Sequence, residues 1–205
     1  MRKLVSIIFM IMISLICFSQ STDQQIINKI NASASKLTTM QCDIVQVKSV
    51  KLLNDKITSK GKMYYSQPNK LRWEYTSPYS YTFILSGNKV TLQKDKKSNI
   101  IDVNQNKMFR EIVNIMMNSV VGKCLSDKKS FKTTVKDSSS EWVATLIPQS
   151  KELKQMFSKI VLHFNKQQSV IVKVDMFEKN GDTTTITLEN IVKNKSINEK
   201  VYSIH

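Results

Sequence analysis

Residues 61–87, GKMYYSQPNKLRWEYTSPYSYTFILSG, carry the pattern that decides the fold. This stretch holds seven of the sixteen aromatic residues, and Pro-Asn and Ser-Pro turns divide it into alternating strands. Leu71, Trp73 and Tyr75 alternate with polar residues, so large apolar side chains fall on one face of a strand. The sequence therefore predicts a sheet with one strongly apolar face, which covers either the protein's own core or a bound ligand.

The beginning of the chain is typical of an export signal. Two basic residues follow Met1, and residues 4–16 form an apolar run interrupted only by two serines. A membrane-spanning helix needs about 20 apolar residues, so this run is too short for a strong anchor. The small residues Cys17 and Ser19 stand where signal peptidase reads the chain. We therefore predict a signal peptide at residues 1–19 and a single domain at residues 20–205.

The cysteines leave two interpretations open. Lipidation of Cys17 is disfavoured because the bulky Ile16 precedes it, so Cys42 and Cys124 are the cysteines of the mature chain. After export they could form a disulfide, or they could be two small buried side chains. Neither has a His or Cys neighbour at the spacing of a metal site. We therefore predict no metal site and no cofactor.

The chain is strongly basic. Its formal net charge of +15 falls to +13 when Arg2 and Lys3 leave with the signal. Nucleic-acid binding is disfavoured, because phosphate and base recognition prefer arginine. After the signal the chain has only two arginines, Arg72 and Arg110, and its lysines are scattered. We expect no nucleic-acid partner. The charge predicts instead an attraction of low specificity to anionic membrane surfaces or acidic partners.

The pattern after the signal is mainly β. An amphipathic helix comes first, because one helical face collects Ile26, Ile27, Ile30, Ala34 and Leu37. Alternation then predicts strands at residues 40–53, 57–65, 70–76, 81–86, 89–94, 131–135, 141–146, 159–164, 169–177 and 183–191. Consecutive strands without crossover helices favour an antiparallel meander and exclude most nucleotide-binding folds. About ten or eleven such strands close, or nearly close, into a barrel.

Two further helices are predicted, at residues 106–122 and 151–157. The first is rich in methionine, with Met108, Met116 and Met117 among its apolar residues. Three interpretations of these thioethers remain open: core packing, a lid that faces a ligand, and copper ligation.

The sequence contains no recognisable catalytic constellation. His163 and His205 are the only histidines, and His163 alternates with Leu162 and Phe164, which places it on the outer face of a strand. No Gly-x-Ser-x-Gly nucleophile elbow is present, and the glutamates stand singly rather than in pairs. We therefore expect that the protein is not an enzyme.

The order of motifs points to a known family. The relevant segments are GKMYY (61–65), QPNKLRWEY (67–75), SP (77–78), SGNKV (86–90), ATLIP (144–148), KIVLHF (159–164), VDMF (174–177) and TITLEN (185–190). Together they resemble the outer-membrane lipoprotein carrier family, LolA, with the Arg-Trp-Glu-Tyr-x-x-Pro segment as the most specific part. The resemblance implies an incomplete antiparallel β-barrel with an N-terminal helix and an inserted helical lid. A hydrophobic cavity under the lid holds acyl chains of lipoproteins that cross the periplasm from the inner to the outer membrane.

The resemblance and the alternation together give the expected site. We expect the cavity wall to contain Met63, Tyr65, Leu71, Trp73, Tyr75, Phe83 and Leu85. We expect the lid to contain Phe109, Ile112, Met116 and Met117. The alternative is that half of these residues are ordinary core.

This sequence differs from many members of the LolA family in two features. Gln67 stands just before the Pro of the Pro-Asn turn, where many members carry a basic residue implicated in opening and closing the lid. Arg72 could substitute for it as a latch at the rim, paired with a carboxylate or a helix-end carbonyl. The chain also ends at His205 without the C-terminal extension of the enterobacterial carriers, so we expect handover to differ.

The resemblance also implies partners and a location. The cargo would be acylated lipoproteins, loaded from an inner-membrane release complex and delivered to an outer-membrane acceptor, with the protein a periplasmic monomer. An alternative is a carrier or sensor of another lipid or hydrophobic molecule. Regulators similar to RseB share this fold, but they carry a further domain for which we expect no room here.

Overall fold

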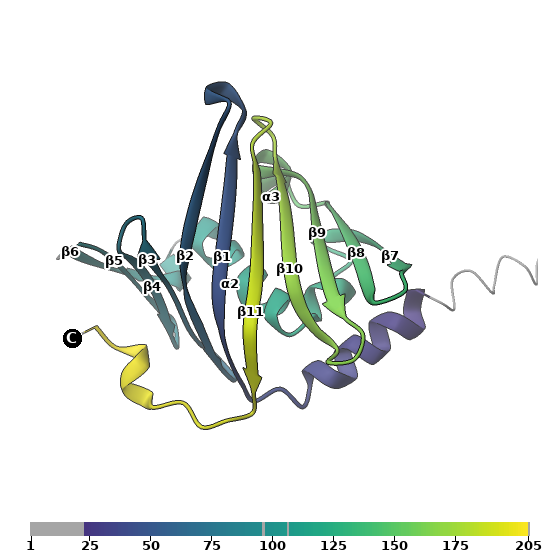
Figure 1. The fold of residues 1–205 in the computed structure, drawn as a ribbon, viewed down its shortest axis with the longest axis horizontal. Helices are drawn as coiled ribbons and strands as arrows, with labels where there is room; N and C mark the ends of the chain where they lie inside the picture. Colours follow the sequence, from purple (N-terminus) through teal and green to yellow (C-terminus); the bar gives the residue numbers. More distant parts are fainter. Residues whose placement is uncertain (1–22, 96, 106, 205) are drawn as a thin grey trace, which may run out of the picture.

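An antiparallel sheet of eleven strands dominates the computed structural model, which describes residues 23–95, 97–105 and 107–204 (Figure 1). The strands lie in the order β6-β5-β4-β3-β2-β1-β11-β10-β9-β8-β7. Their bounds are β1 (Thr39–Val50), β2 (Asp55–Ser66), β3 (Lys70–Ser77), β4 (Tyr81–Ser86), β5 (Lys89–Lys94), β6 (Lys97–Asp102), β7 (Phe131–Asp137), β8 (Glu141–Pro148), β9 (Phe157–Asn165), β10 (Val170–Glu178) and β11 (Thr183–Lys193). Within the described residues β6 and β7 form the two edges of the sheet, which is not closed. The predicted incomplete antiparallel barrel is confirmed.

Two strand predictions need correction. Strand β6 was not predicted, because as an edge strand it is exposed at nearly every position and shows no apolar alternation. The first predicted strand, 40–53, also extends too far. Its last residues form a 3-10 turn, η1 (Lys51–Leu53), which Asn54 closes in the left-handed region at φ 48°.

A close approach of β2 and β3 depends on Gly61, the first residue of the aromatic stretch. The register shifts between Lys60 and Gly61, which marks a bulge that bends and twists the strand. A Cβ at Gly61 would lie 1.7 Å from the carbonyl oxygen of Glu74. Only glycine therefore allows the two backbones to meet here.

Three α-helices accompany the sheet in the described part of the chain. Residues 23–34 form the described part of the N-terminal helix, which buries its predicted apolar face. The other two are α2 (Lys107–Val120) and α3 (Lys151–Met156), so the predicted helices at 106–122 and 151–157 are confirmed. In Figure 1, α2 lies behind the sheet and the N-terminal helix lies beside its lower right end.

Packing joins the N-terminal helix to the end of α2. Gly122 follows α2 with φ +68°, and a Cβ there would lie 2.5 Å from Ile30 Cγ2. Ile30, Ala34 and Leu37 enter the same hydrophobic core as the sheet. Apolar side chains therefore connect this helix to the end of α2, beside a pocket of about 190 Å³ that Ile30 and Leu37 help to line.

No helix in residues 23–95, 97–105 and 107–204 combines the length and apolar character that crossing a bilayer requires. The predicted signal peptide at residues 1–19 lies outside the described residues.

Candidate ligand-binding cavity

A cavity of about 480 Å³ lies between one face of the sheet and the helices α2 and α3. Strands from both halves of the sheet contribute to it. The described residues that line it are Met63, Leu71, Trp73, Tyr75, Tyr81, Phe83, Leu92, Ile115, Met116, Ser119, Val120, Met156, Phe157, Ile160, Ile171, Val174, Met176, Ile186 and Leu188. Its volume falls within the range of about 300–1,000 Å³ that is usual for ligand sites.

The lining is almost entirely apolar. None of the described lining residues carries a charged side chain. The only polar side-chain groups in the described lining are the Ser119 hydroxyl, the tyrosine hydroxyls and the tryptophan N–H. Met63, Met116, Met156 and Met176 supply four flexible thioethers, which adapt to irregular apolar shapes. The cavity is therefore suited to an apolar ligand rather than to an ion or a polar metabolite.

Two tyrosines place their rings in the cavity wall without bringing charge. The Tyr75 hydroxyl donates a hydrogen bond to Gln46 Oε1 at 2.6 Å. Burial raises the pKa of Tyr75 to about 12 and also raises the pKa of Tyr81. Trp73 and Tyr75 pack edge to face, with ring centroids 6.3 Å apart at an interplanar angle of 70°. Both phenols stay neutral at physiological pH.

The structure divides the predicted site residues into three groups. Met63, Leu71, Trp73, Tyr75, Phe83 and Met116 line the cavity. Tyr65 and Leu85 are buried in the core outside the described lining, and Met117 is half-buried against the core. The side chains of Phe109 and Ile112 lie outside the described part of the structure, although their backbone belongs to α2.

Much of the cavity was not predicted. The second half of the sheet, β9 to β11, contributes an aliphatic wall that includes Ile160, Val174 and Ile186. These residues alternate as the aromatic ones do, so their common face was visible in the sequence. Alternation alone gave no reason to separate them from ordinary core.

The proposed latch residues lie outside the cavity. Arg72 Nε donates to Glu74 Oε2 at 2.6 Å, and its Nη1 donates to the carbonyl oxygens of Val201 at 3.1 Å and Ser203 at 3.3 Å. Arg72 thus ties the segment after β11, with its 3-10 turn η4 (Glu199–Tyr202), to the outer face of β3. Gln67 is exposed at the β2–β3 turn. A latch role for either residue stays a prediction.

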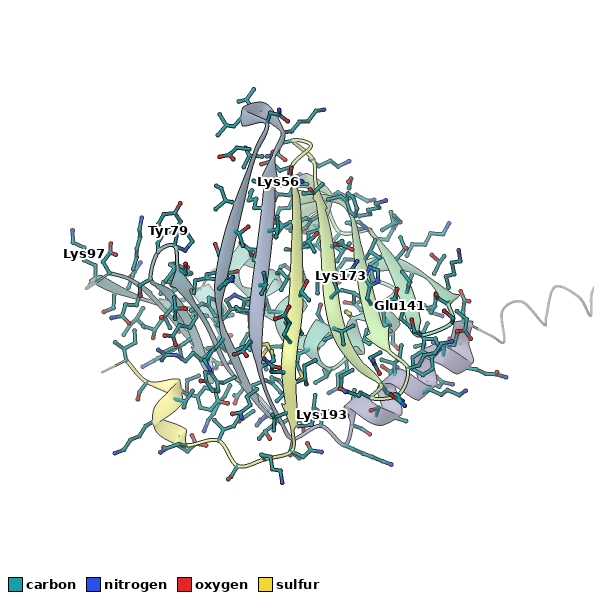
Figure 2. All side chains as sticks on the ribbon, in the orientation of Figure 1. Lys56, Tyr79, Lys97, Glu141, Lys173 and Lys193 are labelled. Carbon is teal, nitrogen blue, oxygen red and sulfur yellow. The ribbon has the colours of Figure 1, made fainter. Side chains whose placement is uncertain are left out.

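His163 belongs to a polar network on the outer face of the sheet. Its Nδ1 lies 3.0 Å from Glu141 Oε2, and its Nε2 lies 3.0 Å from Asp175 Oδ2. Burial by itself raises the pKa of Asp175, but hydrogen bonds from Thr185, Lys173 and His163 and the Lys173 charge outweigh it and lower that pKa. Figure 2 shows Glu141 and Lys173 on the side of the sheet turned away from α2. This network therefore lies on the other side of the sheet from the cavity.

The cysteines do not form a disulfide. Cys42 and Cys124 are both free and buried, which decides between the two interpretations left open by the sequence. Burial raises the pKa of each thiol to about 12, so the reactive thiolate is scarce at neutral pH. Within the described residues no group of three or more His, Cys, Asp or Glu side chains could hold a metal ion.

Comparisons with known proteins agree with this geometry. The sequence profile of the family described as outer membrane lipoprotein carrier protein LolA matches residues 35–205. A protein from Methylococcus capsulatus called outer-membrane lipoprotein carrier protein is 22% identical over 202 residues, which cover 95% of this chain and 91% of that protein.

Two solved structures share the fold at low identity. An uncharacterized conserved protein from Thermus thermophilus aligns with a TM-score of 0.57 at 9% identity, covering 90% of this chain and 94% of that one. A chain of the MucA/MucB complex from Pseudomonas aeruginosa aligns with a TM-score of 0.55 at 8% identity, covering 90% of this chain and 61% of that one. At such identities the likeness concerns the fold alone.

Proposed function

This chain belongs to the LolA family of outer-membrane lipoprotein carriers, and on that premise we propose that it is a periplasmic carrier that shuttles lipoproteins from the inner to the outer membrane. The acyl chains of the cargo would occupy the cavity between the sheet and α2. The observation that carries the proposal is this large apolar cavity without a charged side chain in its described lining. The family is one of binding and transport proteins, and the proposed role requires no covalent chemistry.

The physical need for such a cavity is large. Exposing an acyl chain to water costs about 0.8 kcal/mol for each CH₂, or about 12 kcal/mol for a chain of ~15 methylenes. Unassisted transfer of a lipidated protein through an aqueous compartment is therefore very slow. A cavity that covers the chain during transit removes most of this barrier.

A carrier must also release its cargo, and α2 is suited to this task. It places Ile115, Met116 and Val120 over the cavity, while Val113 is buried in the core. Methionine contacts adapt to different chain positions at little cost in strain. We propose that α2 is a lid, and that Trp73, Tyr75 and Met116 contact the acyl chain.

A reconstituted release assay tests the proposal. Inner-membrane vesicles loaded with a lipoprotein and containing the family's release complex are incubated with the purified protein, and soluble lipoprotein is measured. We expect the wild type to release cargo as a soluble complex and Met116→Asp to release little, because the new carboxylate lies in the cavity. Asn114→Asp is the matched control, since it adds the same charge to an exposed position of α2. No release by the wild type would contradict the proposal.

The remaining parts of the proposal concern location and partners. Export would follow cleavage after Ser19, so intact-mass measurement of the exported protein should give a chain that begins at Gln20. A chain that retains residues 1–19 would contradict this step. The inner-membrane release complex and the outer-membrane acceptor are proposed from the family, as is a monomeric carrier.

A second candidate is carriage or sensing of another lipid or hydrophobic molecule. The described lining has no charged side chain, so it fits this function as well as it fits lipoprotein carriage. Such a cavity recognises the hydrocarbon chain and not the group attached to it. Mass spectrometry of the molecules that copurify with the protein separates the two functions. Acylated peptides support lipoprotein carriage, whereas free lipid or pigment alone supports the second candidate.

A further inference from the structure

The β1–β2 hairpin ends in a tip, Lys51–Lys56, which carries two adjacent leucines and projects beyond the neighbouring strands at the top of Figure 1. Leu52 is 92% exposed and Leu53 is 67% exposed. Single exposed hydrophobic residues are common on protein surfaces. Two adjacent leucines at the apex of a projecting hairpin present a continuous apolar surface to the surroundings.

The structure holds this tip in place. The backbone N–H of Lys51 donates to Asp182 Oδ1 at 3.0 Å, and Lys48 forms an ion pair with Glu178 at 3.1 Å. The Lys51 side chain also packs on Gly181, where a Cβ would lie 2.6 Å from Lys51 Cδ. The tip is therefore docked on the β10–β11 turn. Its leucines belong to the 3-10 turn η1, which holds them in exposed positions.

Basic side chains surround the two leucines. Lys51 and Lys56 flank them in the tip, and Lys179 is exposed in the adjoining β10–β11 turn (Figure 2 labels Lys56). The one acidic residue of the tip, Asp55, accepts a hydrogen bond from the Lys56 backbone. We call these three lysines the basic collar. Exposed leucines with lysines around them suit insertion into a lipid interface, because the lysine stems reach to the headgroups while the leucines enter the acyl region.

The cavity approaches the surface beside this tip. Met156, Phe157 and Met176 line the cavity and also a second, more open pocket of about 410 Å³. This second pocket extends to Lys179 and Asn180 in the same turn that supports the tip. The second pocket therefore adjoins the cavity at Met156, Phe157 and Met176 and reaches the turn on which the tip docks.

We propose that the tip inserts Leu52 and Leu53 into the interface of an anionic lipid bilayer and so brings the Met156–Met176 end of the cavity to the membrane surface. An acyl chain would then pass between bilayer and cavity through the second pocket. The passage of the chain rests on the proposed function, whereas the lipid affinity of the tip does not. The basic collar favours lipid over a protein groove, because anionic headgroups attract several lysines at once without a fixed geometry.

Vesicle flotation tests the inference. The full chain and its variants are expressed and purified identically from the soluble fraction and mixed with phosphatidylglycerol–phosphatidylcholine vesicles or pure phosphatidylcholine vesicles. We expect the Leu52→Asn/Leu53→Asn double variant to lose about tenfold or more in binding to the mixed vesicles. Ile100→Asn on β6 is the matched control, because Ile100 is 65% exposed but far along the sheet from the tip, and it should change binding less than about twofold.

A charge variant and a second readout complete the test. Lys51→Gln/Lys56→Gln should weaken binding to the mixed vesicles and leave binding to pure phosphatidylcholine unchanged. Binding of a fluorescent fatty acid without vesicles should be the same in all tip variants, because the tip lies outside the described cavity lining.

Several outcomes would overturn the inference: no flotation of the wild type, equal flotation of the double leucine variant, or an equal loss with Ile100→Asn. If the wild type binds the fatty acid but does not float, insertion of the tip into the bilayer is wrong and the proposed carriage stands. The exposed leucines would then bind a protein partner. If it floats but binds no fatty acid, the proposed carriage fails and the membrane tip stands.

Discussion

The two ends of the cavity-facing side of the sheet differ, although one strand crosses both. On β3, Leu71 is 1% exposed and lies where the cavity lining meets a closed region formed by Met40, Tyr65 and Leu85. Two residues later on the same face, Trp73 is half-buried and lines the cavity. We call the first region the packed end and the second, around Trp73, Tyr75, Tyr81, Leu92 and Met176, the open end.

The difference between these ends is whether side chains fill the space beside the sheet. At the packed end Met40, Tyr65 and Leu85 are almost completely buried outside the described cavity lining, whereas the open end faces α2 across the cavity. Alternation determines which face a side chain takes, but the packing around it determines whether that side chain is core or lines the cavity. Substitutions at the two ends should therefore affect different measurements.

The largest effect is expected at the packed end. Leu85→Ala removes a side chain that is 2% exposed, and large-to-small changes in a core lower the free energy of unfolding by about 2–5 kcal/mol. Urea denaturation measures this loss. Fatty-acid affinity of the folded protein should stay within about twofold, since Leu85 lies outside the described lining. A large loss of affinity with little loss of stability would break the distinction between the ends.

The reverse pattern is expected at the open end. Trp73→Ala should lower fatty-acid affinity about tenfold, or ~1.4 kcal/mol, because the chain loses a large apolar contact. The free energy of unfolding should fall by less than about 1 kcal/mol, since the side chain is already half-buried beside a cavity. Affinity and urea denaturation are measured on the same preparation. Equal losses in both would show that Trp73 is core.

A titration on the outer face should affect stability alone. The pKa of Asp175 is lowered in the folded protein, so its stabilisation is present above the unfolded value near 3.8 and is lost as the pH falls through the folded pKa. Asp175→Asn should cost about 1 kcal/mol at pH 7 and reduce the loss of stability on acidification, because Thr185, Lys173 and His163 lose a charged partner. Unfolding followed from pH 7 to acid measures both. A change in fatty-acid affinity at pH 7 would contradict the separation of the two faces.

The smallest effect is expected on the lid. Met116→Leu conserves volume and should keep fatty-acid affinity within about twofold. Met116→Gln, of similar length, should lower it about threefold because a polar group then faces the chain. Fluorescence titration distinguishes these values. Equal affinities for the two variants would place Met116 outside the contact surface and make α2 a passive cover.

Local patterns in the sequence predicted most of the fold. Each of the ten predicted strands and all three helices is present, because period-two and helical patterns survive wherever one face is buried. The missed strand β6 lies at the sheet edge, where no face is buried, and Lys51–Leu53 continued an alternating run although the chain turns there. The segment that Arg72 binds after β11 was missed because the only regular element in its described part is the 3-10 turn η4, which is too short to leave a periodic pattern.

The candidate site was predictable only in part. Aromatic density drew attention to Trp73, Tyr75 and Phe83, which do line the cavity. Tyr65 and Leu85 have the same alternation but lie in the packed end, outside the described cavity lining, and alternation alone does not separate the two environments. The aliphatic residues of β9–β11 have the sequence pattern of ordinary core, and only the structure shows that they line the same cavity as the aromatic residues.

The central claim is that an acyl chain occupies the open end against Trp73, and fluorescence quenching by a fatty acid brominated at mid-chain tests it most directly. Bromine quenches indole on contact, and the two tryptophans of the chain, Trp73 and Trp142, can be separated with Trp142→Phe and Trp73→Phe. Trp142 is buried outside the described lining, so it is the internal control. The account predicts saturable quenching in Trp142→Phe and little in Trp73→Phe. Equal quenching in both variants, or none in Trp142→Phe, would contradict it.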